Sequence, residues 1–290
     1  MIFGLIGAAL LVVGDAYRLR RFCWAAPVLV LFLLASQPCL SLVPTTTYDH
    51  LLLTADYRLG HDFAVGRAFS GPTLINAIHM VYAMLPLTVA YVYSLLDGDP
   101  RKRFGFAALL AGAAAPFFYA ICPAAGPAYV FGDAFPFHPP VLEFPLPFSA
   151  PGLTMNAVPS GHLAWAMLAW WHSRPCIVGV RIATGLFVLG TAVATLASGE
   201  HYLVDLVVAV PFAVAVDAVI GRRWVSAASC AAVVLAWSLA LRAGMVSAAS
   251  SRVAIPLAAA TVVAPLVLRA FTPDRSDTQT RSRRASRTAT

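Results

Sequence analysis

Two short segments of the chain place ionisable or hydrogen-bonding residues at the start of an apolar run. In the first, Pro159-Ser160-Gly161-His162 comes directly before a run that begins at Leu163. Ser160 is a good helix N-cap, and the amides of Gly161 and His162 would be free at a helix N-terminus, which suits an anion such as phosphate. Alone, this segment also fits an ordinary capped helix with a histidine near its start.

The second segment runs from Gly199 to Asp205 and opens another apolar run. His201 and Asp205 are four residues apart and would share one helix face, where the carboxylate can accept a hydrogen bond from one imidazole nitrogen. The other nitrogen would be free to attack or to bind. One alternative is a purely structural pair, in which the two side chains hydrogen-bond to each other inside a helix bundle. Two histidines and an aspartate that converge beside a helix N-terminus would instead suit phosphoryl transfer.

These groups belong to a chain whose composition is that of a membrane protein. Of its 290 residues, 60% are hydrophobic and 11% are charged, whereas a soluble domain carries about 25% charged residues. This composition excludes a soluble enzyme and a disordered protein. The net charge of +7 comes from Arg residues at the ends of apolar runs and in a polar tail, so it does not indicate nucleic-acid binding.

The apolar runs predict an all-α, polytopic membrane protein, because a bilayer core about 30 Å thick needs about 20 apolar residues per helix. We expect spans near residues 2–14, 22–43, 72–96, 104–124, 159–173, 176–198, 201–220, 224–243 and 252–271. The first is short enough to be a half-inserted segment. Residues 1–271 would form a single transmembrane domain, and the Arg-rich tail 272–290 would be disordered and cytoplasmic.

The basic residues are divided unevenly between the two sides that these spans define. Sixteen of the 20 Lys and Arg residues fall on one side, and the others are Arg58, Arg67, Arg242 and Arg252. Because cytoplasmic loops are enriched in Lys and Arg, the first side is predicted to be cytoplasmic. Loops 44–71, 125–158 and 199–200 would then face outward from a multi-pass protein of the plasma or inner membrane.

The two long outward loops differ in composition. Residues 44–71 mix apolar and charged residues, which predicts a short amphipathic stretch in the membrane interface. Residues 125–158 contain aromatic residues and many prolines but no Lys or Arg, and the prolines prevent a continuous helix. This segment would be either a lid over a lipid-facing site or interfacial packing.

In combination, the two motifs resemble those of the type-2 phosphatidic acid phosphatase superfamily. Pro159 to His162 matches its second motif, and Gly199 to Asp205 matches the core of its third. Pro123 to Tyr129 is similar to the loop before the second motif in the inositolphosphotransferase-like branch, which includes inositol phosphorylceramide synthases. The resemblance covers about residues 22–220 and implies a six-helix core, to which this chain adds about two to three transmembrane helices.

The resemblance implies a metal-independent phosphoryl transfer that needs no cofactor. His201 would be the nucleophile that forms a phosphohistidine, and Asp205 would orient and polarise it. His162 would protonate the departing oxygen and later activate the acceptor. The remaining motif residues are expected to bind the substrate: Ser160, Gly161 and Gly199.

The chain departs from the family pattern in its cationic residues. The Lys and Arg of the family's first motif have no counterpart near residues 110–127, and the Arg six residues before the third-motif histidine is replaced by Thr195. Met155 stands where many relatives carry Arg. Either the substrate is a phosphodiester of lower charge or positive charge comes from elsewhere, for which Arg58 and Arg67 are the best candidates by topology.

Several other polar residues are weaker candidates. His79 and Tyr82 could line the site, but packing inside the bundle is the favoured interpretation. Glu200 would either tune the neighbouring histidine or face solvent. Three residues of the aromatic loop are candidate headgroup contacts: Asp133, His138 and Glu143.

The sequence therefore favours a membrane enzyme that transfers or hydrolyses a phosphate-containing lipid headgroup at the extracytoplasmic face. Its partners would be a lipid phosphate or phosphodiester and the bilayer. Transfer is slightly favoured over hydrolysis by a lipid phosphate phosphatase, because the cationic clamp is missing. A catalytically silent lipid-binding scaffold is the alternative from another class. A secondary transporter would show inverted repeats, and none is evident in the chain.

Overall fold

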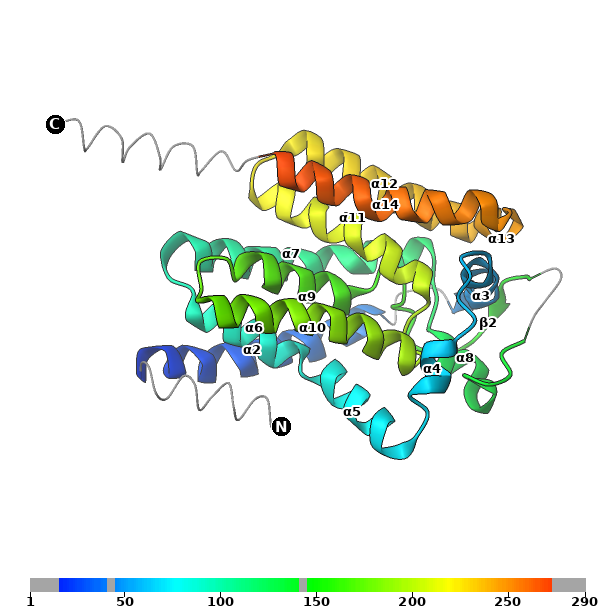
Figure 1. The fold of residues 1–290 in the computed structure, drawn as a ribbon, viewed down its shortest axis with the longest axis horizontal. Helices are drawn as coiled ribbons and strands as arrows, with labels where there is room; N and C mark the ends of the chain where they lie inside the picture. Colours follow the sequence, from blue (N-terminus) through cyan, green and yellow to red (C-terminus); the bar gives the residue numbers. More distant parts are fainter. Residues whose placement is uncertain (1–15, 41–44, 141–144, 273–290) are drawn as a thin grey trace.

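The computed structural model describes residues 16–40, 45–140 and 145–272. It shows a bundle of long helices with short helices and loops at one end (Figure 1). The expected first span at 2–14 lies outside the described residues, and so does nearly all of the expected tail, from residue 273 onward.

The described part is almost entirely helical. The long helices are α2 (Ala16–Leu40), α7 (Gly98–Ile121), α9 (Gly161–His172), α10 (Val178–Ala197), α11 (Leu203–Ile220), α12 (Trp224–Arg242) and α14 (Ser251–Phe271). Two further helices follow one another, namely α5 (Pro72–Ala83) and α6 (Leu85–Leu95). The short elements are α3 (Asp49–Arg58), α4 (Ala64–Ala68), α8 (Pro127–Phe131), the 3-10 turn η1 (Gly132–Ala134), α13 (Met245–Ala248) and the antiparallel pair β1 (Thr46–Thr47) and β2 (Phe148–Ser149).

Five of the described helices are long and apolar enough to cross a membrane: α7, α10, α11, α12 and α14. A sixth span results if α5 and α6 are counted as one broken span. The protein is thus an all-α, multi-pass membrane protein, as its composition predicts.

The run at 72–96, expected to be one continuous span, is broken. Helices α5 and α6 meet at Met84 with a bend of 42°. Pro86 lies in the first turn of α6 and has no amide hydrogen with which to continue the hydrogen bonding of α5. Helix α5 therefore departs from the direction of α6, and Figure 1 shows it projecting from the bundle.

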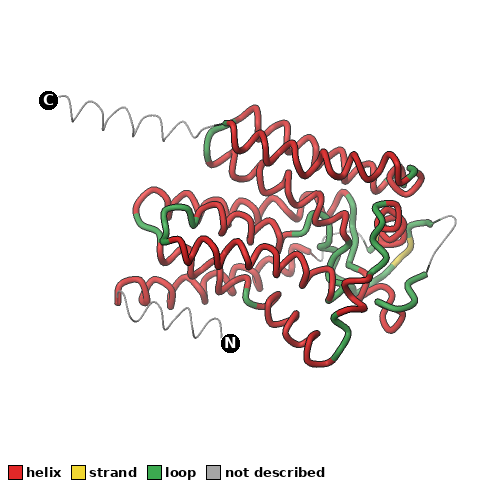
Figure 2. The backbone as a smooth tube through the Cα atoms, in the orientation of Figure 1, coloured by secondary structure: helices red, strands yellow, loops and turns green. Residues whose placement is uncertain are grey.

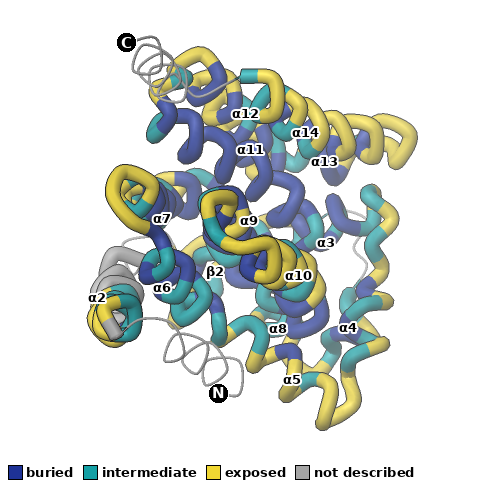
Figure 3. The backbone as a smooth tube through the Cα atoms, turned by 60° about the vertical axis from the view of Figure 1, so that its left-hand side comes forward, coloured by how far each residue is buried: buried dark blue, intermediate teal, exposed yellow. Residues whose placement is uncertain are grey.

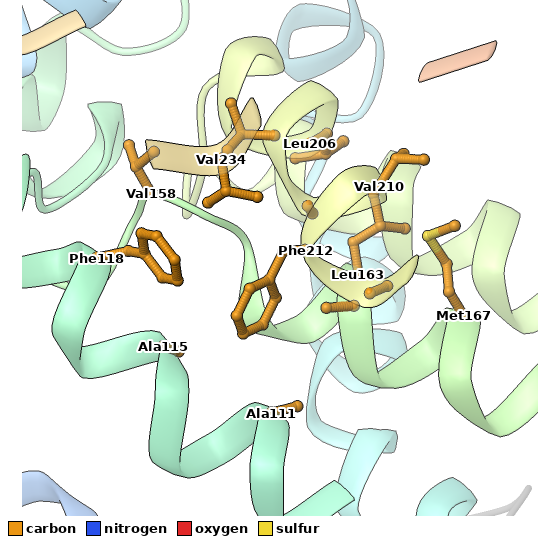
Figure 4. Close-up of a cluster of buried hydrophobic side chains, with 14 of the residues drawn as sticks. Ala111, Ala115, Phe118, Val158, Leu163, Met167, Leu206, Val210, Phe212 and Val234 are labelled. Carbon is orange, nitrogen blue, oxygen red and sulfur yellow. The ribbon is translucent and has the colours of Figure 1, made fainter. Parts of the chain in front are cut away.

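Helix α11 is the centre of the bundle. Its apolar window has a mean hydropathy of 2.4, the highest of the five spans, and is 83% buried inside the protein. Helices α7, α9, α12 and α14 pack around it, and it is buried along most of its length in Figure 3. In this core Phe212 of α11 meets Phe118 of α7 edge to face, with ring centroids 5.8 Å apart. Leu163 and Met167 of α9 belong to the same cluster (Figure 4).

The loops and short helices collect at one end of the bundle (Figure 2), which we call the histidine end because α9 and α11 both begin there. Helix α3 packs against α11, α12 and α13 at this end, and its Leu51, Leu52 and Leu53 are buried. The stretch 44–71 was expected to form an amphipathic segment in the membrane interface. Within this stretch, helix α3 is largely buried against the protein, because its leucines complete the core.

A cluster of charged residues lies at the opposite end of the bundle. Asp217 of α11 is buried and accepts hydrogen bonds from Arg223 and, at 2.9 Å, from Nε of Arg269 in α14. Its other oxygen lies 3.3 Å from Nε2 of His172 in α9. The guanidinium of Arg269 also stacks over Trp171 at 4.1 Å. This cluster joins α9, α11 and α14 at their ends.

Candidate active site

The N-termini of α9 and α11 lie side by side. The amide of Ser160, just before α9, donates to the carbonyl of Asp205 in the first turn of α11 at 3.2 Å. This contact brings His162 and His201 together, with ring centroids 6.3 Å apart and planes inclined by 59°. The two segments that the sequence singled out therefore meet at one place.

His201 and Asp205 form a buried pair. Nδ1 of His201 lies 3.4 Å from Oδ2 of Asp205, and the histidine is 3% exposed while the aspartate is fully buried. The same Oδ2 accepts the amide of Tyr202 at 2.8 Å. The sequence predicted that His201 lies on the helix with Asp205. In the structure His201 lies in the turn before α11, which begins at Leu203. The reason is that Asp205 caps the start of α11 by holding the Tyr202 amide.

The start of α9 leaves two amides without a helical acceptor. The hydroxyl of Ser160 accepts the amide of Leu163 at 3.4 Å, which sets the helix to begin at Gly161. The amides of Gly161 and His162 then lie in the first turn, where no carbonyl of the same helix can accept from them. These donors and the positive end of the helix dipole together favour an anion at this point.

An aromatic and an acidic side chain border the histidines. The ring of Tyr82, at the end of α5, stacks on His162 with centroids 3.7 Å apart and planes inclined by 21°. Glu200, beside His201, accepts the hydroxyl of Tyr129 at 2.9 and 2.8 Å. Burial and the hydrogen bond to Glu200 raise the pKa of Tyr129, so its hydroxyl stays neutral at physiological pH. Packing inside the bundle was the favoured interpretation for Tyr82, but its ring stacks on a histidine of the site, which supports the alternative that it lines the site.

Asp56 of α3 holds the start of α11 from outside the helix. Its oxygens accept the amides of Leu203 at 2.7 Å and Val204 at 2.9 Å, and Nδ1 of His61 lies 2.9 Å from one of them. Asp56 is fully buried. It therefore accepts two free amides of α11, whereas the amides of Gly161 and His162 at the start of α9 have no such acceptor in the first turn.

Asp49, at the start of α3, organises the loop that follows α7. It accepts the amides of Ala125 and Gly126, each at 3.0 Å, and the hydroxyl of Tyr202 at 2.8 Å. The hydroxyl of Thr47 is a further partner. Sequence reasoning placed Asp49 and Asp56 in an amphipathic stretch. It missed the hydrogen bonds of both side chains to the loop after α7 and to the start of α11, because these bonds join residues far apart in the chain.

Gly199 lies in a turn with no room for a side chain. Its φ is +73°, and a Cβ there would lie 2.6 Å from the ring of Phe135 and 2.8 Å from Cβ of Ala128. Its carbonyl accepts the amide of Ala128 at 3.0 Å. The sequence proposed Gly199 for substrate binding, and the structure places it in close packing between the turn and α8.

The two candidate phosphate-binding arginines contact other groups. Nε of Arg58 donates to the carbonyl of Ser247 at 3.1 Å, and Nη2 of Arg67 lies 2.8 Å from Oδ2 of Asp62. The hydrogen bond from Arg67 lowers the pKa of Asp62, which keeps this carboxylate charged. Within the described residues, neither guanidinium has a polar contact with His162 or His201.

Of the weaker candidates of the sequence, Tyr82 and Glu200 border the histidines, and the others do not contact them in the described residues. His79 is exposed on α5, and Asp133 and His138 are exposed in the aromatic loop. Glu143 falls outside the described residues. The described part of the chain contains no group of three or more His, Cys, Asp or Glu side chains that could hold a metal ion.

Comparison with known families gives one match. The family model described as PAP2 superfamily matches residues 50–219, which is more than half of the 290 residues. The matched segment begins in α3 and ends in α11, so it contains both histidines and Asp205. Neither the curated proteins nor the solved structures contain a match to this chain. On this match, the chain belongs to the PAP2 superfamily.

Proposed function

We propose that the protein removes a phosphate-containing headgroup from a lipid by forming a phosphohistidine on His201, and then passes that group to an alcohol or to water. One observation carries this proposal: the rings of His162 and His201 lie 6.3 Å apart beside the free amides of α9. An arrangement of a nucleophile, a second proton-transferring imidazole and an anion-binding helix end has the parts that phosphoryl transfer requires.

In the first step His201 attacks phosphorus. With the Nδ1 hydrogen directed to Asp205, the Nε2 lone pair forms the new P–N bond while the P–O bond to the leaving alcohol breaks. The proton that the leaving oxygen needs comes from protonated His162. The step yields the free alcohol, the phosphohistidine and neutral His162.

In the second step the acceptor takes the phosphoryl group. Neutral His162 removes a proton from the acceptor hydroxyl or water, whose oxygen forms the new P–O bond as the P–N bond breaks. The electron pair of that bond returns to Nε2 of His201. Both histidines thereby recover their starting protonation states.

Two features favour transfer to an alcohol over hydrolysis. His201 is 3% exposed, so bulk water has little access to an intermediate formed on it. Both Arg58 and Arg67 have partners away from the histidines, which favours a phosphodiester of single charge as the substrate. We infer that the enzyme is a lipid phosphotransferase, with a lipid phosphate phosphatase as the second candidate. The inositolphosphotransferase-like reaction is one form that such a transfer could take.

The distribution of basic residues supports an extracytoplasmic site. Of the described Lys and Arg residues, those at the end opposite the histidines are Arg18, Arg20, Arg21, Arg101, Lys102, Arg103, Arg174, Arg181, Arg222, Arg223 and Arg269. Those at the histidine end are Arg58, Arg67, Arg242 and Arg252. Because basic residues accumulate on the cytoplasmic side, we place the histidine end outside, in the plasma or inner membrane.

Trapping of the intermediate tests this function. The purified protein in detergent is given a panel of lipid phosphates and phosphodiesters with a radiolabelled phosphorus, and labelled phosphohistidine is measured in wild type, H201A and H79A. We expect label on wild type and on H79A, whose altered histidine is exposed on α5, and none on H201A. Added alcohols then separate transfer from hydrolysis. A folded wild type that takes no label across the panel would leave the silent lipid-binding scaffold as the better explanation.

A further inference from the structure

Tyr119 of α7 is a buried residue whose hydroxyl has no hydrogen-bond partner among the described residues. The residue is 7% exposed and lies in the last turns of α7, near the histidine end. Its oxygen is not one of the fully enclosed, unpartnered polar atoms of the described residues, so water or a bound group can reach it. A bound phosphate oxygen can therefore accept its hydrogen bond.

The hydroxyl of Tyr119 faces the first residue of α9. A Cβ on Gly161 would lie 3.1 Å from the Tyr119 hydroxyl oxygen. Gly161 thus lets this hydroxyl approach closely the helix end where the amides of Gly161 and His162 have no helical acceptor. Three neutral donors, two amides and one hydroxyl, therefore converge next to the two histidines.

The charges around these donors limit the charge of the anion they can hold. The neighbouring carboxylates are Asp49, Asp56, Glu200 and Asp205, all of which support the same two helix starts and loop. The described residues bring no Lys or Arg side chain into polar contact with the histidines. Protonated His162 and the neutral donors stabilise one negative charge, whereas a second charge would face these carboxylates without a further cation to offset them.

We propose that the hydroxyl of Tyr119 donates a hydrogen bond to a non-bridging phosphate oxygen of the substrate, together with the amides of Gly161 and His162. This set of neutral donors selects a phosphodiester monoanion over a phosphomonoester dianion. Tyr119 lies within the segment where the family resemblance would place a cationic pair, so a neutral hydroxyl takes the position of a charged clamp. The lipid nature of the substrate rests on the proposed function, but the binding of the anion does not.

A binding experiment that needs no turnover tests the donor role. Orthovanadate, a phosphate analogue that is largely a monoanion near neutral pH, is titrated into the full-length protein in detergent, and its affinity is measured for wild type, Y119F and Y93F. Loss of one hydrogen bond to an anion should weaken binding to Y119F about tenfold or more. Y93F is the matched control, because it removes a tyrosine hydroxyl on α6 beside Gly105 and should bind like wild type.

Competition with two small probes tests the charge preference. Dimethyl phosphate, a monoanion, should displace vanadate at a lower concentration than methyl phosphate, which carries the second charge. Folded wild type that does not bind vanadate, Y119F that binds as well as wild type, or stronger competition by methyl phosphate would each overturn the proposal.

A turnover measurement separates this inference from the proposed function. If the protein processes lipid phosphodiesters, Y119F should lower kcat/KM for them about tenfold while Y93F leaves it unchanged. If vanadate binding depends on Tyr119 but no lipid is processed and no phosphohistidine forms, the anion site stands and the proposed enzyme activity fails.

Discussion

At the scale of residues, one carboxylate oxygen of Asp205 contacts both His201 and the backbone at the start of α11. Oδ2 of Asp205 faces both Nδ1 of His201 and the amide of Tyr202, while Oδ1 is buried without a partner in the described part of the chain. The carboxylate therefore fixes the imidazole tautomer and also the start of the helix. These two roles can be separated by substitution, because only the first needs a negative charge.

The substitution D205N keeps an oxygen that can accept the amide of Tyr202 but removes the charge beside His201. We expect turnover to fall by about 10²–10⁴-fold, because the imidazole loses its orienting and polarising partner. The unfolding temperature should stay close to that of wild type. Initial rates and thermal unfolding of the two proteins in detergent provide the measurement, and undiminished turnover would remove Asp205 from the proposed mechanism.

The stacking of Tyr82 on His162 gives a second prediction at this scale. Y82L removes the ring that holds the imidazole at 3.7 Å, and it should lower kcat/KM about tenfold because an aromatic contact contributes about 0.5–1.5 kcal/mol. Y82F keeps the ring and serves as the control. Equal rates for the leucine and phenylalanine variants would show that the stacking does not position His162.

The sequence identified the candidate site residues of the two motifs. It could not predict which distant residues hold them in place. His162, His201, Ser160 and Asp205 stand at recognisable spacings within short segments. The contact of Tyr202 with Asp49 joins residues 153 apart in the chain, and no local spacing reports such a pair. Tyr119 was also missed, because a tyrosine inside an apolar run has the pattern of an ordinary core residue.

At the scale of elements, the start of α11 depends on another helix. Asp56 in α3 accepts two of its first amides, so α3 acts as an external cap for the helix that follows His201. The sequence predicted that α11 begins near His201, but it did not predict an external cap. Hydropathy alone also made 72–96 one span, although Pro86 gave a local signal for the break.

The substitution D56A should destabilise the protein through this cap. It leaves the amides of Leu203 and Val204 buried without an acceptor and removes the partner of His61, for which we expect a loss of about 2–3 kcal/mol in the free energy of unfolding. D62A is the control, because Asp62 is exposed and pairs with Arg67 on the surface. Denaturant unfolding in mixed micelles measures both, and D56A as stable as D62A would contradict the external cap.

At the scale of the whole molecule, α11 connects two polar clusters at opposite ends of the bundle. One contains His201 and Asp205, and the other contains Asp217 with Arg223 and Arg269. The order of the apolar spans could be predicted from the apolar runs of the sequence. The sequence could not predict which helix would be enclosed by the others, because helices that face lipid and helices that face protein are both strongly apolar.

The substitution D217A tests the distal cluster. It leaves two buried or half-buried guanidinium groups without their carboxylate, which should cost about 3–5 kcal/mol of stability. D97A, which removes an exposed partner of Arg21, should change stability little. In the fraction that remains folded, phosphohistidine should form as in wild type, because Asp217 lies at the other end of α11. Loss of labelling from folded D217A would show that the two ends of the helix are coupled.

The enclosure of α11 bears on how the chain is assembled in a bilayer. During synthesis this helix precedes α12 and α14, so acyl chains must solvate the surface that these later helices eventually cover. Hydrocarbon and protein interior are similarly apolar, and the exchange of one for the other gains no hydrophobic free energy. Close packing favours it, and small side chains of α11 such as Ala209 and Ala213, both fully buried, allow helices to approach closely. The docking of the late helices onto an already inserted one should therefore depend on the volume of single side chains along α11.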